Sequence, residues 1–219
     1  MQTRELSILL QKELKQELKQ KHTIGSILLY VFATVFVCYL SFKRIVAPPV
    51  WNALYWIILL FASINTVAKS FVAENRARQF MMYSLASPQA IILSKSIYNA
   101  VFLMLVSMLS FFVYSMFIGN LVQDGLYFFV AITLGSMGFG FLLTMVSAIA
   151  SKAGNNLSLM AVLSFPLMIP LLITLIKLSK NAVDGLDRSV SNPLIIMTLC
   201  INLISIALMY ILFPYVWKE

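Results

Sequence analysis

Few residues of this 219-residue sequence have the chemistry of a catalytic or metal-binding site. The chain contains one histidine, His22, and two cysteines, Cys38 and Cys200, which lie far apart in the sequence. A Ser-His-Asp or Cys-His set needs a histidine beside its nucleophile, and no Gly-rich loop is followed by the Lys-Ser or Lys-Thr pair that binds nucleotide phosphates. We therefore predict that the chain is not an enzyme, hydrolyses no ATP, and binds no metal or cofactor by itself.

A few polar residues lie inside long apolar runs, where a hydrogen-bonding side chain has no water to bind. The candidates are Asn65, Thr66, Asn99 and Asn202. Polar groups at membrane depth often line the path of a transported substrate. They also form ordinary hydrogen bonds between neighbouring helices. The sequence leaves both interpretations open, so these residues are candidates for a transport pathway.

The elements that must position these residues are membrane helices. Hydrophobic residues make up 61% of the chain, its mean hydropathy is +0.91, and only 11% of its residues are charged, against about 25% in soluble domains. Six charge-free windows each reach the roughly 20 residues that a helix needs to cross the bilayer. We predict an all-α polytopic membrane protein with a single transmembrane domain over residues 1–219. The predicted spans cover about residues 24–42, 52–72, 96–118, 126–150, 157–177 and 192–213.

The distribution of basic residues predicts the orientation of these spans. Six spans place both termini on one side of the membrane, and that side would hold eleven of the 16 lysines and arginines. Because basic residues concentrate in cytoplasmic loops, we predict that both termini are cytoplasmic. The same rule accounts for the formal charge of +8, so we expect the basic surface to face a lipid bilayer and not a nucleic acid.

Residues 4–21, RELSILLQKELKQELKQK, are predicted to form an amphipathic helix in the membrane interface. Its lysines and leucines gather on opposite sides, which is typical of interfacial helices. The leucines of the apolar side are Leu6, Leu9, Leu10 and Leu14. Glu13 and Glu17 lie near this apolar side. Either the helix rolls so that both carboxylates stay in water, or they meet basic groups of a neighbouring segment or subunit.

The stretch AENRARQFMMYSLASPQAIILSK, residues 73–95, interrupts the apolar runs with a short basic segment. Residues 74–95 are predicted to form a cytoplasmic hairpin between the second and third spans. Ser87 can cap the helix that follows, and Pro88 suits the first helical position. A permease without an ATPase site needs a separate ATPase, and we expect this hairpin to receive its motion. The candidate coupling residues are Glu17, Glu74, Arg76, Arg78, Phe80 and Met81.

Four further features concern the spans and their connections. The fourth span contains GSMGFG, residues 135–140, whose small residues favour close helix approach. The fifth contains Pro166 and Pro170, which should kink or break the helix. Residues 177–192 are expected to form the largest outer loop. The aromatic residues expected to anchor the second span at the outer interface are Trp51, Tyr55 and Trp56.

Several of these stretches resemble the CcmB family, the haem exporter permease subunit of bacterial cytochrome c maturation. The similar stretches are WIILLFASINTVAKSFVAEN (residues 56–75), LASPQAIILSK (85–95), SFPLMIPLLI (164–173) and ELKQK (17–21). The resemblance implies an ABC-2-type permease of the bacterial inner membrane. It also implies a cytoplasmic ATPase subunit (CcmA), a haem-handling membrane protein (CcmC) and a second copy of this chain as partners, with haem as the cargo of the complex.

Three functions follow from the residues and this resemblance. The chain is expected to be the membrane permease that a separate ATPase drives in haem export for cytochrome c biogenesis. Alternatively, it transports nothing and relays ATP-driven motion to the haem-handling partner, which then releases a loaded haem chaperone. A third function is an ABC-2 permease for another cargo, such as a lipid or a polysaccharide.

Overall fold

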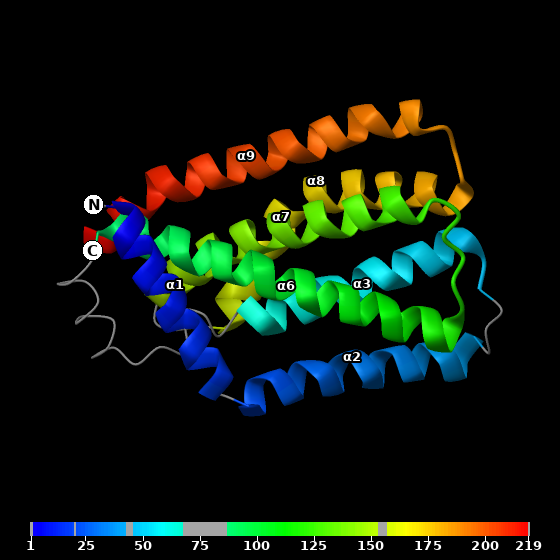
Figure 1. Cartoon of the computed structure of the whole chain (residues 1–219), viewed down its shortest axis with the longest axis horizontal. Helices are drawn as coiled ribbons and strands as arrows, with labels where there is room; N and C mark the ends of the chain where they lie inside the picture. The colour runs from blue at the N-terminus through cyan, green and yellow to red at the C-terminus, as the bar shows by residue number, and fades with distance from the viewer. Residues whose placement is uncertain (1, 20, 43–45, 68–86, 153–156, 219) are drawn as a thin grey trace.

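The computed structural model describes residues 2–19, 21–42, 46–67, 87–152 and 157–218, which form seven helices and no strand (Figure 1). The helices are α1 (Gln2–Lys19), α2 (Lys21–Phe42), α3 (Pro48–Val67), α6 (Pro88–Ile118), α7 (Gly125–Lys152), α8 (Leu157–Asp184) and α9 (Arg188–Lys218). All of them except α1 are long and apolar enough to cross a membrane. The predicted all-α class with six membrane spans is therefore confirmed.

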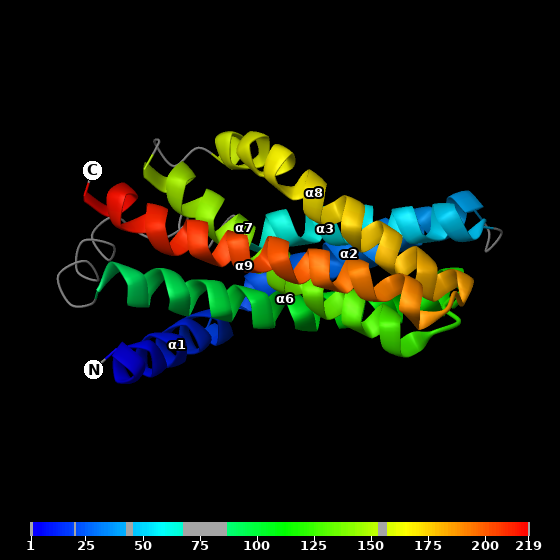
Figure 2. The same ribbon diagram turned by 90° about the horizontal axis from the view of Figure 1, so that it is seen from above.

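The six long helices lie side by side in one elongated bundle, while α1 leans obliquely against it (Figures 1 and 2). We call the end where α6 begins and α9 ends the base of the bundle, and the opposite end the top. The base lies on the left of Figure 1 together with both termini. The top carries the short turn between α8 and α9 and the connection from α6 to α7.

The predicted outer loop over residues 177–192 is wrong, because α8 continues to Asp184 and α9 already begins at Arg188. The turn between them covers residues 185–187, where Gly185 adopts a φ of 66° that suits glycine. The helix continues because Leu178 and Ala182 are buried on its inner face. The lysines that suggested a loop lie on the exposed side of the same helix.

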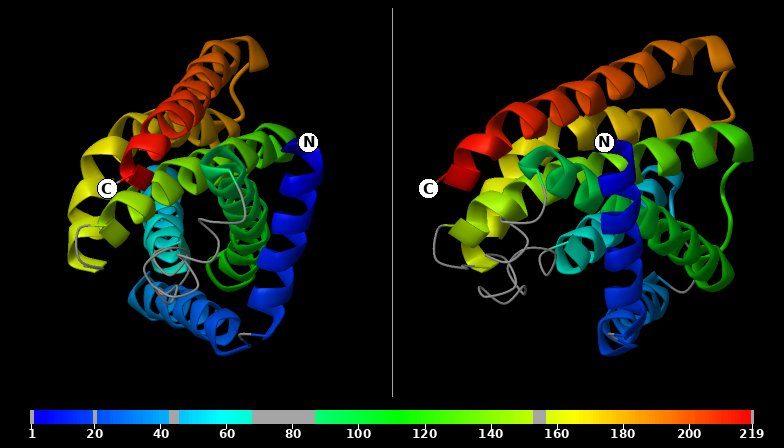
Figure 3. Two further views of the ribbon diagram at one scale, coloured as in Figure 1. Left: turned by 90° about the vertical axis from the view of Figure 1, so that its left-hand side faces the viewer. Right: turned by 60° about the vertical axis from the view of Figure 1, so that its left-hand side comes forward.

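Helix α7 forms the centre of the bundle and packs against α3, α6, α8 and α9 (Figure 3). Within its apolar span 78% of the residues are buried, against 17% in α2 and 22% in α9. A Cβ atom added to Gly140 would lie 2.7 Å from the Cα of Ala100 on α6. One added to Gly138 would lie 2.5 Å from a side-chain carbon of Leu171 on α8. The predicted close approach at GSMGFG is therefore confirmed, and these contacts lie within one chain.

Candidate functional site

Most of the predicted coupling residues lie outside the described part of the chain. Residues 68–86 are not described, and they include Glu74, Arg76, Arg78, Phe80 and Met81. Glu17 lies in α1, but its side chain is not described either. The hairpin and its contacts therefore stay a prediction. The described residues next to it are those of α1 and the first turns of α6.

Helix α6 begins where the sequence predicts, with Pro88 in its first turn and Ser87 as the preceding cap residue. Ser87 has an extended backbone (φ −67°, ψ 141°), but its side chain makes no capping hydrogen bond, so this part of the prediction is wrong. Instead its hydroxyl donates to Oε2 of Glu5 on α1, 3.4 Å away. The start of α6 is thus bonded to the amphipathic helix.

The second contact between these helices is a buried ion pair. Nζ of Lys95 on α6 lies 3.3 Å from Oε2 of Glu13 on α1, and the two side chains are 2% and 8% exposed. Nζ of Lys12 lies 3.5 Å from the other oxygen of the same carboxylate. Burial of an ammonium and a carboxylate is tolerated here because the two charges neutralise each other. The second of the two alternatives for Glu13, that it meets a basic group of a neighbouring segment, is therefore confirmed.

The two contacts fix the direction of α1. Glu5 pairs with Ser87 and Glu13 with Lys95, so each partner lies 82 positions further along the chain. Such equal spacing means that α1 and the first turns of α6 run in the same direction, and Figure 3 shows them side by side. The pairs are eight residues apart on each helix, about 12 Å of α-helix.

The leucine face of α1 is only partly covered by the rest of the protein. Leu9 is buried, although the sequence predicted that it would enter the lipid. Leu6 and Leu10 are half-buried, and Leu14 is 52% exposed. The difference arises because α1 turns its glutamate-containing face toward Lys95, which rotates Leu9 toward the protein. The position of α1 relative to a membrane stays a prediction.

The four candidate pathway residues do not meet at one place. Asn99 donates from Nδ2 to the Thr144 hydroxyl of α7 at 2.8 Å. Asn202 donates from Nδ2 to the Leu134 carbonyl of α7 at 3.1 Å. The Thr66 hydroxyl donates to a carbonyl of its own helix, at 2.7 Å. Two of the candidates therefore join neighbouring helices, and a third is bonded within α3.

Two further polar groups of these candidates, Oδ1 of Asn202 and the Asn65 amide, lie in different parts of the bundle. The Oδ1 atom of Asn202 is buried and has no hydrogen-bond partner among the described residues. Asn65, which precedes Thr66 in α3, is exposed and lines the space between α2 and α3. The described residues thus favour hydrogen bonding between helices for Asn99 and Asn202, whereas a pathway role stays a prediction.

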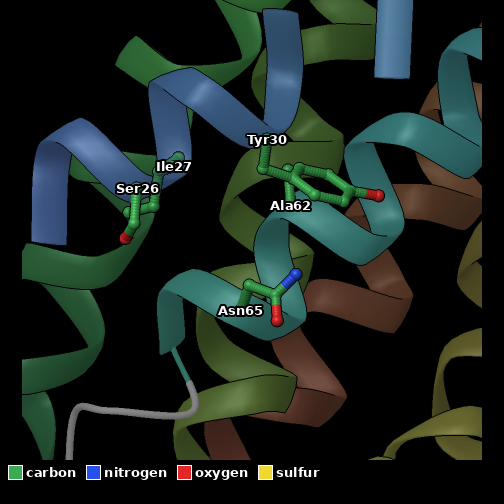
Figure 4. Close-up of a pocket in the computed structure, with 5 residues that line it drawn as sticks. All are labelled: Ser26, Ile27, Tyr30, Ala62 and Asn65. Atoms are coloured by element: carbon green, nitrogen blue, oxygen red, sulfur yellow. The ribbon is translucent and has the colours of Figure 1, made fainter. Parts of the chain in front are cut away.

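A small pocket lies between α2 and α3, with a volume of about 250 Å³ (Figure 4). Its described lining residues are Ser26, Ile27, Tyr30, Ala62 and Asn65. Figure 4 shows the Tyr30 ring and the Asn65 amide on neighbouring helices, with Ala62 between them. These described lining residues offer uncharged donors and acceptors, which could bind the polar group of an amphiphile.

The three aromatic residues of α3 face the inside of the bundle, so the prediction that they anchor the chain in the membrane interface is wrong. Trp51, Tyr55 and Trp56 are each at most 1% exposed. The indole of Trp51 donates to the Gly119 carbonyl at 2.9 Å, and the Tyr55 hydroxyl donates to the Ser107 carbonyl at 3.2 Å. Buried tryptophan and tyrosine need such partners, and neighbouring segments supply them here.

Helices α3 and α8 are joined by a buried polar cluster, which we call the outer clamp and define as Asn52, Trp56 and Ser179. The Trp56 indole donates to the Ser179 hydroxyl at 2.7 Å, and that hydroxyl lies 2.8 Å from Oδ1 of Asn52. The Asn52 amide donates to the Ile176 carbonyl at 2.9 Å. All three side chains are buried, so the clamp ties the upper halves of the two helices together.

An exposed ion pair closes the top of the bundle. Nε of Arg188, the first residue of α9, donates to Oδ2 of Asp124 at 2.9 Å. The other carboxylate oxygen accepts from the backbone N–H of Leu126 and Tyr127, so Asp124 also caps α7. The hydrogen bond from Arg188 is the main reason why the pKa of Asp124 is lowered. The contact joins the α6–α7 connection to the start of α9.

The prolines of the fifth span do not break it. Pro166 and Pro170 both lie inside the continuous helix α8. Each lacks the N–H that would bond to the carbonyl four residues earlier, so the helix is weakened there without ending. The predicted break is therefore wrong, while the predicted kink stays a prediction.

Sequence reasoning missed the outer clamp and did not single out Lys95. A signal for Lys95 was present, because it is the only charged residue between Arg78 and Asp124. An isolated charge in such an apolar stretch needs a partner of opposite charge. Asn52 and Trp56 gave no comparable signal, since their spacing places them on one helix face without showing which helix that face meets.

Comparisons with known proteins agree with this architecture. The profile of the CcmB protein family matches residues 4–214, which is nearly the whole chain. No curated protein and no solved structure was found to match it. The chain therefore belongs to the CcmB protein family, the non-catalytic membrane permease subunit of the haem exporter in cytochrome c maturation.

Proposed function

We propose that this permease receives ATP-driven motion at the base of the bundle, where α1 and the start of α6 meet. The observation that supports the proposal is the buried pair of Glu13 and Lys95, which joins α1 to the last residue of the predicted hairpin. Family membership implies an ABC transporter complex with an ATPase partner. The proposed contacts of that ATPase are Glu17, Glu74, Arg76, Arg78, Phe80 and Met81.

The proposed orientation places the base in the cytoplasm of a bacterium and the top outside its inner membrane. The excess of lysine and arginine on the side of the termini supports it. The proposed complex contains two copies of this chain, a haem-handling membrane protein of the same system, and haem as the cargo. Homodimers are the commonest symmetric assemblies, which is consistent with two copies.

A second candidate function is that of a coupling subunit through which no haem passes. It is favoured by the use of Asn99 and Asn202 in hydrogen bonds to α7, which leaves fewer polar groups for a cargo path. In this case the bundle passes motion to the haem-handling partner, which releases the loaded chaperone. Stoichiometric haem on the purified chain alone, seen in its absorption spectrum, would exclude this second function.

A charge exchange tests the proposed coupling. The single variants Glu13→Lys and Lys95→Glu place like charges together, so we expect c-type cytochromes to lose covalent haem and the ATPase to copurify poorly. The double variant restores opposite charges and should recover both. The exposed pair Asp124 and Arg188 provides the matched control, since its exchange at the top should leave both readouts unchanged. Normal maturation in both single variants would refute the proposal.

A further inference from the structure

Helices α6 and α7 carry matching sets of polar residues along the seam where they meet. The set on α6 is Ser96, Asn99, Ser107 and Ser110, and the set on α7 is Thr133, Ser136, Thr144 and Ser147. Both sets have intervals of three, eight and three residues. Seven of the eight residues are buried, and Thr133 is half-buried. We call these residues the polar seam.

Two contacts fix how the sets face each other. The Asn99 amide donates to the Thr144 hydroxyl at 2.8 Å, and the hydroxyls of Ser107 and Ser136 lie 2.8 Å apart. Because the helices are antiparallel, these pairs also set the other positions of the seam. Ser96 then lies at the level of Ser147, and Ser110 at the level of Thr133, but the Ser96 hydroxyl bonds to Sδ of Met209 on α9 and Ser147 Oγ has no partner among the described residues. Two of the four seam residues of α6, Asn99 and Ser107, are therefore hydrogen-bonded to α7.

In the middle of the seam the backbones of α6 and α7 are in close contact. Gly140 of α7 lies against Ala100 of α6, between the two hydrogen-bonded pairs. A Cβ atom on Gly140 would lie 2.7 Å from the Cα and 2.8 Å from the backbone nitrogen of Ala100. The two backbones are therefore as close as a glycine allows, and a bulky residue moved to this place would force them apart.

Sliding one helix by a turn would break both hydrogen-bonded pairs of the seam. A shift of three residues, about 4.5 Å, in one direction would place Ser107 opposite Phe139. In the other direction it would place Asn99 opposite Phe141. Either shift therefore leaves one of these two residues of α6 facing an apolar side chain. A buried polar group without a partner is costly in an apolar surrounding, so the present alignment is the preferred one.

We infer that α6 and α7 keep this alignment throughout the transport cycle and move as one rigid unit, with Asn99, Thr144, Ser107 and Ser136 as its positioning residues. This inference rests on the proposed function, because it says how motion received by α6 spreads through the bundle. Displacement of α6 carries α7 with it, and α7 contacts α3, α8 and α9. Relative motion then occurs between this unit and the other helices.

Disulfide trapping in the complete complex tests the inference directly. The starting chain has Cys38 and Cys200 replaced by serine. Ser107→Cys with Ser136→Cys reports the present alignment, while Ser110→Cys with Ser136→Cys and Ser107→Cys with Thr133→Cys report one-turn shifts in the two directions. We expect only the first pair to cross-link efficiently, and to the same extent with and without ATP. An ATP-dependent rise of either shifted pair would overturn the inference.

Function of the cross-linked chain gives a second readout. Oxidised Ser107→Cys with Ser136→Cys should mature c-type cytochromes as well as the reduced chain does. Loss on oxidation with recovery on reduction would mean that α6 and α7 must slide, and would overturn the inference. If this variant does not accumulate, Asn99→Cys with Thr144→Cys reports the same alignment. Normal cytochromes in a strain that lacks this chain would instead refute the proposed function, and the cross-linking pattern would still report the alignment.

Discussion

Glu13 of α1 and Lys95 of α6 form a buried ion pair in which Nζ lies 3.3 Å from Oε2. The pair joins the amphipathic N-terminal helix to the span that follows the predicted hairpin. The opposite charges partly offset the cost of burying both groups, so the contact is sensitive to the loss of either partner. It makes α1 part of the helical bundle at its base.

Replacing one partner of this pair should destabilise the chain. Glu13→Gln removes the carboxylate 3.3 Å from the buried Lys95 ammonium, and breaking a buried ion pair costs about 3–5 kcal/mol. The expected result is a clearly lower Tm of the detergent-solubilised chain. Lys15→Gln is the control, because Lys15 lies on the exposed side of α1. Equal Tm values for the two variants would contradict the buried pair.

The close approach of α6 and α7 predicts that Gly140 does not tolerate alanine. The added methyl group meets the backbone of Ala100, so the helices must separate, at a typical cost of about 1–3 kcal/mol. Gly25→Ala is the matched control, since an added Cβ there meets nothing within 4 Å. Thermal unfolding should show a lower Tm for Gly140→Ala alone. An unchanged Tm for this variant would argue against the tight α6–α7 contact.

The outer clamp predicts a loss of stability when the Ser179 hydroxyl is removed. Ser179→Ala takes away the acceptor of the Trp56 indole and the donor to Asn52, and each buried unsatisfied group costs about 1–3 kcal/mol. Ser41→Ala is the control, because that hydroxyl is exposed and bonds to a carbonyl of its own helix. Tryptophan fluorescence during thermal unfolding measures the difference. A Ser179→Ala chain as stable as the control would show that the clamp contributes little.

The ion pair at the top predicts a small, pH-dependent effect. The hydrogen bond from Arg188 lowers the pKa of Asp124, so its stabilisation is complete above the ordinary pKa of an aspartate and is lost as the pH falls through the lowered value. Asp124→Asn should therefore lower the Tm slightly at pH 7 and have no effect in strong acid. High salt should also reduce the difference, because Arg188 is 59% exposed. A difference that grows as the pH falls would contradict this sign.

Replacing the two prolines of α8 should raise the stability of the chain but lower its function. Pro166→Ala with Pro170→Ala restores two backbone hydrogen bonds and removes a helix-breaking residue at each place, so the Tm should rise. If a kink in α8 is part of the transport cycle, maturation of c-type cytochromes should fall in the same chain. Pro48→Ala is the control for both measurements, because Pro48 is the first residue of α3, where a missing N–H breaks no helical hydrogen bond. A higher Tm with full maturation would show that the kink is not needed.

The sequence by itself determined the elements of this protein. Continuous apolar runs can cross a bilayer only as helices, because the backbone must satisfy its own hydrogen bonds there. The start of α6 at Pro88 could be predicted because proline suits the first helical position. The close packing at GSMGFG could be predicted because small residues let helices approach each other. The isolated charge of Lys95 and the misplaced charge of Glu13 each indicated that a partner was needed.

Tertiary structure decided which side chains meet. The sequence placed Trp51 and Trp56 at the correct end of α3, but only packing showed that they face inward, since both faces of an apolar helix look alike. Packing likewise extended α8 through Lys177 and Lys180, because the buried face of the helix continues beyond them. The pairing of Glu13 with Lys95 and the alignment of the polar seam depend on contacts between distant segments, which no local pattern specifies.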